Sequence, residues 1–384
     1  MPQIIIGIDI RVLGNSIKSG IEEYTENLIP HLIREGRDVQ FKLFYSSSKN
    51  KLPDYPWLKE KNVELYKFNY SNNILFTSSR FLDRPFIDRM VRGADVFFFP
   101  HFFISSLSTS CKRVTTFHDL SYVHFPEHLT FRKKLWHNLQ MLPEWQAKFS
   151  DKIIAVSEST KSDLVNFYKI DPARIEVIYS GTELRLNLNQ ERFNLKEFKA
   201  QKNLSDRFIL FLGKLEPRKN IVSIIKAFNN LKTNSKYNDV GLVIAGAKGW
   251  KCDELFSLLR LNLKDNNPII FTGQVSDEER FLYYRAADVF VYPSFFEGFG
   301  FPPLEAMSCG TPVITSRNSS LPEVVGDAAI MIDPYDVGEL ELWITKILDD
   351  KDLSDLIAKR GIEQVSKFNW RGAAIKTLEV LIKT

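Results

Sequence analysis

Short apolar runs alternate with longer segments of helical periodicity along most of the chain, and this alternation constrains the fold more than any other feature. It is typical of α/β proteins with a parallel sheet, because each crossover between parallel strands needs a long connection, usually a helix. In the first half we expect strands at residues 4–8, 39–44, 95–99, 113–116, 153–156 and 175–178, and helices at 21–35, 131–149 and 159–167.

A second cycle of the same kind follows a polar stretch, residues 181–202, which we interpret as a linker between domains. Here we expect strands at 208–212, 241–245, 269–271, 289–292, 312–315 and 329–332, helices near 221–231, 277–287 and 303–309, and further helices at the end. A length of 384 residues agrees with two domains. Because α/β sheets bind ligands beyond the carboxyl ends of their strands, we expect an active site in a cleft between two facing units.

The composition excludes several classes of protein. Hydrophobic residues make up 44% and charged residues 26%, which argues against a disordered or coiled-coil chain. No apolar run reaches the roughly 18 residues that cross a bilayer, and residues 4–9 read as a first strand and not as a signal peptide. The three cysteines are widely spaced, so we expect a reducing cytoplasm. A net charge of +4 is too small to indicate a nucleic-acid partner.

Motifs of metal and redox enzymes are absent from the sequence. The nearest match to the dinucleotide-binding motif GxGxxG, residues 298–303, has proline in place of the third glycine, and residues 241–248 fail as a P-loop. There is no HExxH motif, and the Asp-x-Asp at 350–352 is flanked by helical sequence, so we interpret it as an exposed junction between helices. We therefore expect neither a metal nor another cofactor, and a Rossmann oxidoreductase is disfavoured.

A glycine-rich loop after the expected strand at 289–292 carries the strongest functional signal. Gly298 and Gly300 allow the backbone to approach a ligand closely, and the prolines that follow suit the first turn of a helix, whose N–H groups attract anions. Glu297 stands in the loop and Glu305 eight residues later in the helix. Carboxylates accept hydrogen bonds from hydroxyl groups, so this pair suits the recognition of sugar and ribose. The alternative is a surface loop with a capped helix.

A basic loop, residues 213–220, follows the expected strand at 208–212. Gly213 begins it, and Lys214, Arg218 and Lys219 place three cations at the carboxyl end of the strand. Residues 201–250 hold nine Lys and Arg against three Asp and Glu, which also indicates an anionic ligand. A diphosphate held by charge-assisted hydrogen bonds would fit here. An ordinary basic turn is the alternative.

Weaker candidates lie in the first half of the chain. Gly20 stands just before an expected helix and would allow a phosphate to approach, although an ordinary helix start is an equal interpretation. His118 follows an expected strand and would face the cleft, unless it is a core or capping histidine. His101 has a similar placement with less support.

In this order the motifs resemble those of the family-4 retaining glycosyltransferases, which have the GT-B fold of two Rossmann-like domains. Glu297 and Glu305 reproduce the family's Glu-x7-Glu motif, and residues 213–220 resemble its Gly-x-Leu-Glu-Pro-Arg-Lys-Asn loop. Residues 153–159, 241–249 and 286–289 resemble further family segments. The resemblance covers nearly the whole chain. It implies an acceptor-binding domain at 1–185, to which a C-terminal helix at about 368–384 crosses back, and a donor-binding domain at 186–367.

The resemblance also implies roles for individual residues. Glu305 would bind the ribose of a nucleoside diphosphate sugar, and Glu297 the hydroxyls of the donor sugar. Lys219, with Arg218 or Lys214, would neutralise the leaving diphosphate in place of a metal ion. Because all three positions hold cations here, the resemblance leaves open which of them bind the phosphates. Further donor contacts are implied for His118, Gly20, Gly213, Gly298, Phe299, Gly300 and Phe301.

We therefore expect a hexosyltransferase that moves a hexose, with retention of configuration and without a metal ion, from a nucleoside diphosphate sugar to a glycan or lipid-linked acceptor. The basic loop favours GDP-mannose over UDP-glucose. Two alternatives stay open. One is another GT-B enzyme such as a nucleotide-sugar 2-epimerase, and the other is a catalytically silent subunit that binds nucleotide sugars.

Residues 80–92 mix arginines with apolar side chains, and residues 132–134 add basic charge to the same domain. Such a segment can lie on an anionic membrane surface, so peripheral contact with the inner face of a membrane is one interpretation. The alternative is an amphipathic helix that packs on its own sheet.

Overall fold

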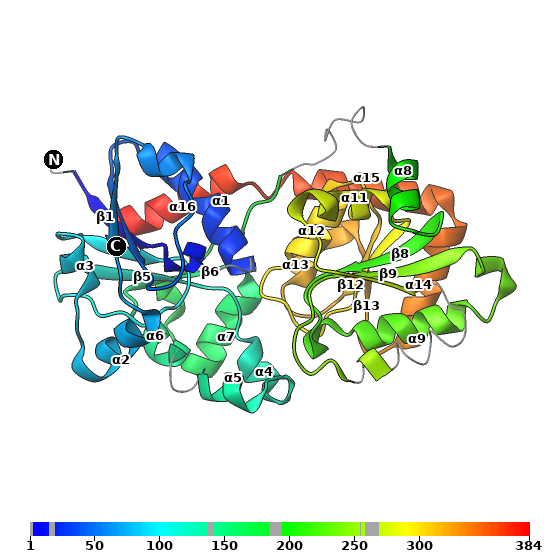
Figure 1. Ribbon diagram of the computed structural model, residues 1–384, viewed down its shortest axis with the longest axis horizontal. Helices are drawn as coiled ribbons and strands as arrows, with labels where there is room; N and C mark the ends of the chain where they lie inside the picture. The colour runs from blue at the N-terminus through cyan, green and yellow to red at the C-terminus, as the bar shows by residue number, and fades with distance from the viewer. Residues whose placement is uncertain (1–2, 15–19, 137–140, 184–193, 254, 258–268) are drawn as a thin grey trace. The chain divides into compact units, whose positions relative to one another are not determined.

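The computed structural model describes residues 3–14, 20–136, 141–183, 194–253, 255–257 and 269–384. The chain forms two compact units (Figure 1). The first comprises Met1–Leu120, Phe131–Gly181 and Phe368–Thr384, and the second Ser121–Thr130 and Thr182–Lys367. The expected first domain comprises all of residues 1–185, whereas in the structure residues 121–130 belong to the second unit.

A parallel sheet of seven strands forms the centre of the first unit, in the order β3-β2-β1-β4-β5-β6-β7. Its central strands are continuous apolar runs because both faces of the sheet are covered, and all four residues of β4 are buried. The strands are β1 (Ile5–Asp9), β2 (Gln40–Ser46), β3 (Val63–Phe68), β4 (Val96–Phe99), β5 (Lys112–Phe117), β6 (Lys152–Ala155) and β7 (Ile175–Val177).

Helices cover both faces of this sheet, with α1 and α16 on one side and α6 and α7 on the other in Figure 1. Helix α16 lies against α1, where the rings of Tyr24 and Trp370 are 5.9 Å apart and Arg371 pairs with Glu35. The α-helices are α1 (Gly20–Glu35), α2 (Asn72–Leu82), α3 (Ile87–Met90), α5 (Phe131–Trp136), α6 (Pro143–Phe149), α7 (Glu158–Tyr168) and α16 (Trp370–Lys383). The 3-10 turns are η1 (Arg11–Gly14), η2 (Pro56–Lys59) and η5 (Pro172–Arg174).

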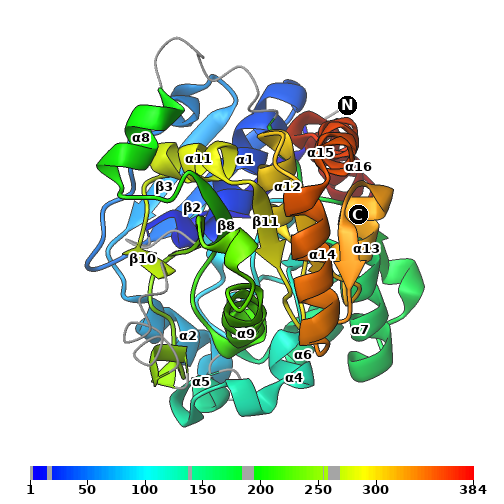
Figure 2. The ribbon, with the colours of Figure 1, turned by 90° about the vertical axis from the view of Figure 1, so that its right-hand side faces the viewer.

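The second unit holds a six-stranded parallel sheet in the order β10-β9-β8-β11-β12-β13. Strands β8 and β11 are neighbours at its centre, with Leu210 opposite Phe290, so the loops that follow them leave the same edge of the sheet (Figure 2). The strands are β8 (Arg207–Leu212), β9 (Val240–Ala245), β10 (Ile269–Gly273), β11 (Val289–Tyr292), β12 (Val313–Ser316) and β13 (Ile330–Ile332).

Helices α11 and α12 lie on one side of this sheet and α9 on the other (Figures 1 and 2). Helix α9 buries Ile221, Ile224, Ile225 and Phe228, which recur at helical spacing along one face. The α-helices are α4 (Ser121–His124), α8 (Leu195–Gln201), α9 (Ile221–Leu231), α11 (Asp277–Ala286), α12 (Phe301–Ser308), α13 (Leu321–Val325), α14 (Val337–Asp349) and α15 (Lys351–Val365). The 3-10 turns are η3 (Pro126–His128), η6 (Pro217–Lys219), η7 (Ser235–Tyr237) and η8 (Gly326–Ala328).

The two parallel sheets confirm the predicted α/β architecture, with two differences in detail. Strand β3 and helices α2 and α8 were not among the expected elements. The single helix expected over 131–149 is wrong, because Leu142 has a left-handed φ of 41° and α6 begins after it. The Asp-x-Asp at 350–352 lies at the junction of α14 and α15, where Asp350 caps α15. In the described part of the chain, no helix is long and apolar enough to cross a membrane.

Candidate active site

The loop between β11 and α12 positions Glu297, a carboxylate that is 6% exposed. The hydroxyl of Ser294 donates to its Oε1 at 2.5 Å, and its own backbone N–H donates to Ser319 at 2.8 Å. Ser320 donates to the Glu297 carbonyl at 2.9 Å. Three serines from this loop and the one after β12 thus fix both the backbone and the side chain of Glu297.

Two cations from the loop after β8 hold the carboxylate of Glu297. Nζ of Lys219 lies 2.6 Å from Oε1, and a guanidinium nitrogen of Arg218 lies 2.9 Å from Oε2. Lys219 also donates to the hydroxyl of Tyr292 at 2.5 Å, and Arg218 pairs with Glu216 at 2.7 Å. We call Glu216, Arg218, Lys219 and Glu297 the charged cluster, in which two cations face two carboxylates. It forms because the loops after neighbouring strands leave the sheet together.

The charged cluster keeps Glu297 ionised. Burial alone would raise the pKa of this carboxyl, but the charges of Arg218 and Lys219 and the hydrogen bonds from Lys219 and Ser294 lower it to about 2. The hydroxyl of Tyr292 stays protonated, because burial and the Glu297 charge raise its pKa well above 10. The cluster therefore offers fixed charges and hydrogen-bond partners, and a poor base.

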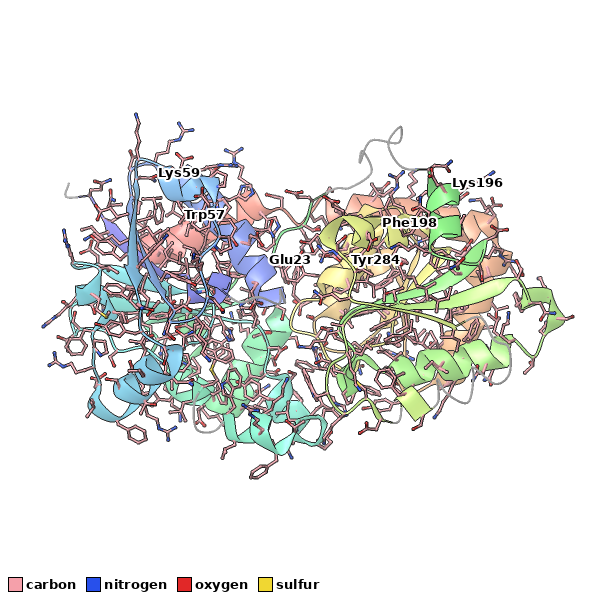
Figure 3. All side chains as sticks on the ribbon, in the orientation of Figure 1. Glu23, Trp57, Lys59, Lys196, Phe198 and Tyr284 are labelled. Atoms are coloured by element: carbon pink, nitrogen blue, oxygen red, sulfur yellow. The ribbon has the colours of Figure 1, made fainter. Side chains whose placement is uncertain are left out.

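Glu305 lies on α12 and is 4% exposed. Tyr284 donates its hydroxyl to Oε2 at 2.8 Å, and Arg280 lies 3.1 Å from Oε1. Both partners come from α11, and Figure 3 labels Tyr284 inside the second unit. Glu305 is predicted from its motif, whereas neither partner is, because both stand on the expected helix at 277–287 without a motif of their own.

The turn at residues 298–301 brings Glu297 and the start of α12 together. Gly298, Phe299 and Gly300 are buried, and Phe301 is half-buried as the first residue of the helix. Gly300 has a φ of +102°, and a Cβ there would lie 2.9 Å from Leu321. This position therefore requires glycine on two grounds, its backbone angle and its packing.

Lys214 stands apart from the charged cluster. Its side chain is exposed, and its Nζ lies 5.3 Å from the centre of the Trp250 ring. The preceding Gly213 donates its N–H to Ala245 at 2.9 Å, which ties the loop to the end of β9. Of the three predicted phosphate-binding cations, the structure brings Arg218 and Lys219 together on Glu297 and places Lys214 on an aromatic face.

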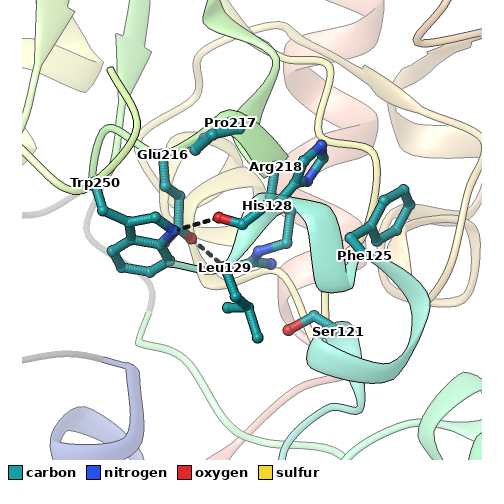
Figure 4. A pocket seen from close by; sticks show the side chains of 8 residues that line it. All are labelled: Ser121, Phe125, His128, Leu129, Glu216, Pro217, Arg218 and Trp250. Carbon is teal, nitrogen blue, oxygen red and sulfur yellow. Dashed lines mark hydrogen bonds and ion pairs between the residues drawn. The ribbon is translucent and has the colours of Figure 1, made fainter. Parts of the chain in front are cut away.

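A pocket adjoins Arg218 and Glu216 in the second unit (Figure 4). One wall comes from residues 121–130, which the sequence analysis assigned to the other domain. The indole N–H of Trp250 donates to the carbonyl of His128 at 2.9 Å across it. The lining residues are Ser121, Phe125, His128, Leu129, Glu216, Pro217, Arg218 and Trp250.

The predicted site residues of the first half lie in the first unit. Nε2 of His118 lies 2.8 Å from the carbonyl oxygen of Pro100. The His118 ring packs edge-on against the ring of Tyr24, with 4.9 Å between the ring centres. Burial lowers its pKa, which the hydrogen bond to Pro100 opposes. His101 is 9% exposed, with its ring 5.9 Å from that of His118. Gly20 is the exposed first residue of α1.

The three cysteines are buried and free, and among the described residues no group of three or more His, Cys, Asp or Glu side chains is placed to hold a metal ion. Groups suited to bind a ligand in the second unit include the charged cluster, the backbone N–H groups of residues 298–301, and Glu305 with its α11 partners. Carboxylates suit hydroxyl groups, and the cations suit phosphate oxygens.

Two family models match the chain in succession. Residues 18–186 match "Glycosyltransferase Family 4", and residues 193–364 match "Glycosyl transferases group 1". The chain is also 29% identical over 382 residues to the O-antigen chain mannosyltransferase B of Escherichia coli. The matched region covers 94% of this chain and 95% of that protein.

Solved structures share the fold at lower sequence identity. The sucrose-phosphate synthase of Thermosynechococcus elongatus has a TM-score of 0.74 at 21% identity and covers 99% of this chain and 98% of its own. Anabaena Alr3699/HepE, solved in complex with UDP-glucose, has a TM-score of 0.70 at 17% identity, with 99% and 100% coverage. These likenesses confirm the predicted two-domain α/β fold.

Proposed function

Because the chain belongs to the group 1 glycosyltransferases of family 4 and has their GT-B fold, we propose that it transfers mannose from a nucleoside diphosphate sugar to a glycan acceptor. The family confirms the prediction of a hexosyltransferase. The choice of mannose is supported by the E. coli relative, whose name describes a mannosyltransferase of the O-antigen chain. Retention of configuration and independence of metal ions are further parts of the proposal.

The observation that carries this proposal is the clamp of Arg218 and Lys219 on Glu297, at 2.9 and 2.6 Å. A nucleotide sugar needs cations for its diphosphate and a carboxylate for its sugar hydroxyls, side by side. An ammonium group has three N–H donors. Lys219 donates to Tyr292 and to Glu297, which are its described partners and take two of the three. The third is available for a phosphate oxygen.

Each predicted site residue then has a proposed role. Arg218 and Lys219 stabilise the charge that develops on the leaving diphosphate, and Glu297 accepts hydrogen bonds from the donor sugar. Glu305 binds the ribose, which requires an oxygen of its buried carboxylate to turn from Tyr284 or Arg280 toward the ligand. Gly213, Gly298, Phe299, Gly300 and Phe301 supply backbone contacts, and Lys214, His118 and Gly20 are proposed as further donor contacts.

A retaining transfer without a general base agrees with the electrostatics. A carboxyl with a pKa of about 2 is a poor proton acceptor near neutral pH, so Glu297 is not suited to activate the acceptor hydroxyl. In the proposed step the acceptor hydroxyl attacks the anomeric carbon on the face from which the diphosphate departs. The sugar–phosphate bond breaks, and the leaving phosphate oxygen takes the acceptor's proton.

The test is to incubate the full chain with GDP-mannose or UDP-glucose and a mannose oligosaccharide, with and without EDTA. We expect a product longer by one hexose, with the donor's anomeric configuration by NMR, GDP as the preferred nucleotide, and the same rate in EDTA. Loss of the rate in EDTA would contradict the metal-free mechanism. A donor isomerised without acceptor would favour the 2-epimerase, and binding without turnover would favour the silent subunit.

We also propose that the first unit contacts an anionic membrane, which fits a lipid-linked acceptor. Helix α2 packs Leu75 and Phe76 into the unit, so it does cover its own sheet, yet it exposes other apolar side chains, among them Phe81 at 73% and Leu82 at 71%. Arg80 and Arg84 flank them in the sequence, and neither arginine has an ion-pair partner among the described residues. Apolar side chains flanked by cations suit an anionic bilayer surface.

A second exposed patch lies on α5, which, like α2, is on the lower side of the first unit in Figure 1. Phe131 is 81% exposed next to Arg132. We expect the protein to sediment with phosphatidylglycerol vesicles and less with neutral ones, and Phe81→Ser with Leu82→Ser to weaken this binding. Leu342→Ser, on the exposed face of α14, is the control. Equal binding to neutral vesicles, or binding that the double substitution leaves unchanged, would refute the surface.

A further inference from the structure

Residues 121–130, which we call the strap, lie on the second unit although the chain before and after them belongs to the first. The chain leaves the first unit after Leu120 and returns to it at Phe131. Between these points it forms helix α4 and the 3-10 turn η3, neither of which buries a residue fully. The strap therefore owes its position to specific contacts with the second unit and not to a core of its own.

Aromatic rings hold the strap on the loop that carries Glu297. The rings of His124 and Phe296 are 4.5 Å apart, and Phe125 lies 6.3 Å from Phe295 and 6.2 Å from Phe296. His128 stacks on Phe125 at 5.1 Å with only 10° between the ring planes. The two residues directly before Glu297 are thus covered by three rings of the strap.

Two side chains after β9 hold the other side of the strap. Trp250 donates to the carbonyl of His128 at 2.9 Å, and Lys251 donates to the carbonyl of Glu127. Lys214 also lies over the Trp250 ring, with its Nζ 5.3 Å from the centre of the ring. The strap therefore joins the Glu297 loop to the neighbourhood of a third predicted phosphate-binding cation.

The residues that the strap covers also position Arg218. The N–H of Phe295 donates to the Arg218 carbonyl at 2.9 Å, and the Arg218 guanidinium donates to the Phe296 carbonyl at 2.5 Å. The same guanidinium pairs with Glu297. A shift of Phe295 or Phe296 would consequently move both a cation and the carboxylate of the charged cluster.

We propose that the strap is a positioning element for the donor site, in which His124 and Phe125 hold Phe295 and Phe296 and thereby Arg218 and Glu297. The inference rests on the proposed function for its kinetic consequences. The structural part of the inference, that the strap fixes the Glu297 loop, does not depend on the proposed function. His118, which is a predicted donor contact of the first unit, lies three residues before the strap in the sequence.

The test compares His124→Ala with His124→Phe, since His124 is exposed and its removal leaves the core intact. An aromatic pair is worth about 1 kcal/mol, so His124→Ala should raise the donor KM about fivefold while the acceptor KM stays unchanged. His124→Phe keeps a ring on Phe296 and should restore the donor KM. The matched control is Tyr335→Ala, which removes a ring 4.8 Å from Phe295 that is not part of the strap.

A second measurement needs no substrate. In ligand-free protein, the amides of Phe295 and Glu297 donate to Arg218 and Ser319, and we expect His124→Ala to speed their hydrogen exchange while His124→Phe does not. Unchanged exchange and an unchanged donor KM in His124→Ala would overturn the positioning role, as would an equal effect of Tyr335→Ala. Faster exchange in a protein without transferase activity would instead support the strap and contradict the proposed function.

Discussion

Nζ of Lys219 lies 2.6 Å from Oε1 of Glu297, and only 8% of either side chain is exposed. The pair joins the loop after β8 to the loop after β11, two neighbouring strands of the second sheet. In sequence the two residues are 78 positions apart. Because the pair is buried, it also fixes the two loops to each other, which gives it structural as well as chemical consequences.

Replacement of Lys219 tests the role of this cation in turnover. A well-placed donor that stabilises charge in the transition state is worth about 3–4 kcal/mol, so Lys219→Ala should lower kcat by about 10²- to 10³-fold. Binding of the nucleotide diphosphate, measured by calorimetry, should weaken less, because Arg218 remains. Lys226→Ala removes an exposed cation of the same unit and serves as the control. Wild-type turnover in Lys219→Ala would refute the assignment.

The pH dependence of stability tests the ionisation of Glu297. Its pKa is about 2 in the folded protein against 4.5 for the free side chain, so the folded state prefers the charged form. The resulting stabilisation, about 3 kcal/mol as an upper figure, is present above about pH 4.5 and is lost as the pH falls toward 2. Urea unfolding at several pH values should show this loss in the wild type.

Glu297→Gln is the matched variant for that experiment. It removes the titrating group, so its free energy of unfolding should be lower than that of the wild type near pH 6, and the difference should shrink as the pH falls. A difference that stays constant between pH 6 and pH 3 would show that Glu297 is not held ionised by Arg218 and Lys219.

The sequence predicts the strands of both sheets well because most are continuous apolar runs, which parallel sheets with two covered faces require. It fails at β3, whose residues 63–68 mix polar and apolar side chains at the sheet edge without a continuous apolar run, and at α2, whose apolar residues are divided between a buried and an exposed face. In both cases the local pattern is weak, and packing in the folded unit decides the structure.

For the candidate site, sequence reasoning finds residues that belong to motifs and misses those defined by contact. It identified Glu297, Lys219 and Arg218 as separate sugar and phosphate ligands, but not that they pair with one another. Nor could it assign the strap to the second unit, since the aromatic residues that seat it resemble ordinary apolar residues until their partners are known.

Tyr284→Phe tests the support of Glu305. The substitution removes the hydroxyl that donates to Oε2 at 2.8 Å and leaves a buried carboxylate oxygen without that donor, which should cost about 1–2 kcal/mol of stability. We also expect weaker binding of the nucleotide, because Glu305 is less well oriented. Tyr283→Phe, one residue earlier, removes a hydroxyl that is not bonded to Glu305, and should leave nucleotide binding unchanged. Equal effects would contradict the role of this hydrogen bond.

Gly246 tests how tightly the end of β9 is packed against the basic loop. Its φ is +147°, and a Cβ there would lie 1.9 Å from the carbonyl oxygen of Gly213, the residue before Lys214. Gly246→Ala should therefore cost about 3 kcal/mol or more of folding stability, from backbone strain together with steric overlap.

Gly273 separates these two causes, since its φ is +71° but a Cβ would meet no atom within 4 Å. Gly273→Ala should cost only the strain, about 1 kcal/mol, in thermal or urea unfolding. If both variants lose the same stability, the close approach to Gly213 does not constrain the loop. If Gly246→Ala alone is strongly destabilised, and its nucleotide affinity falls as well, the junction of β9 with the basic loop is part of what positions the donor site.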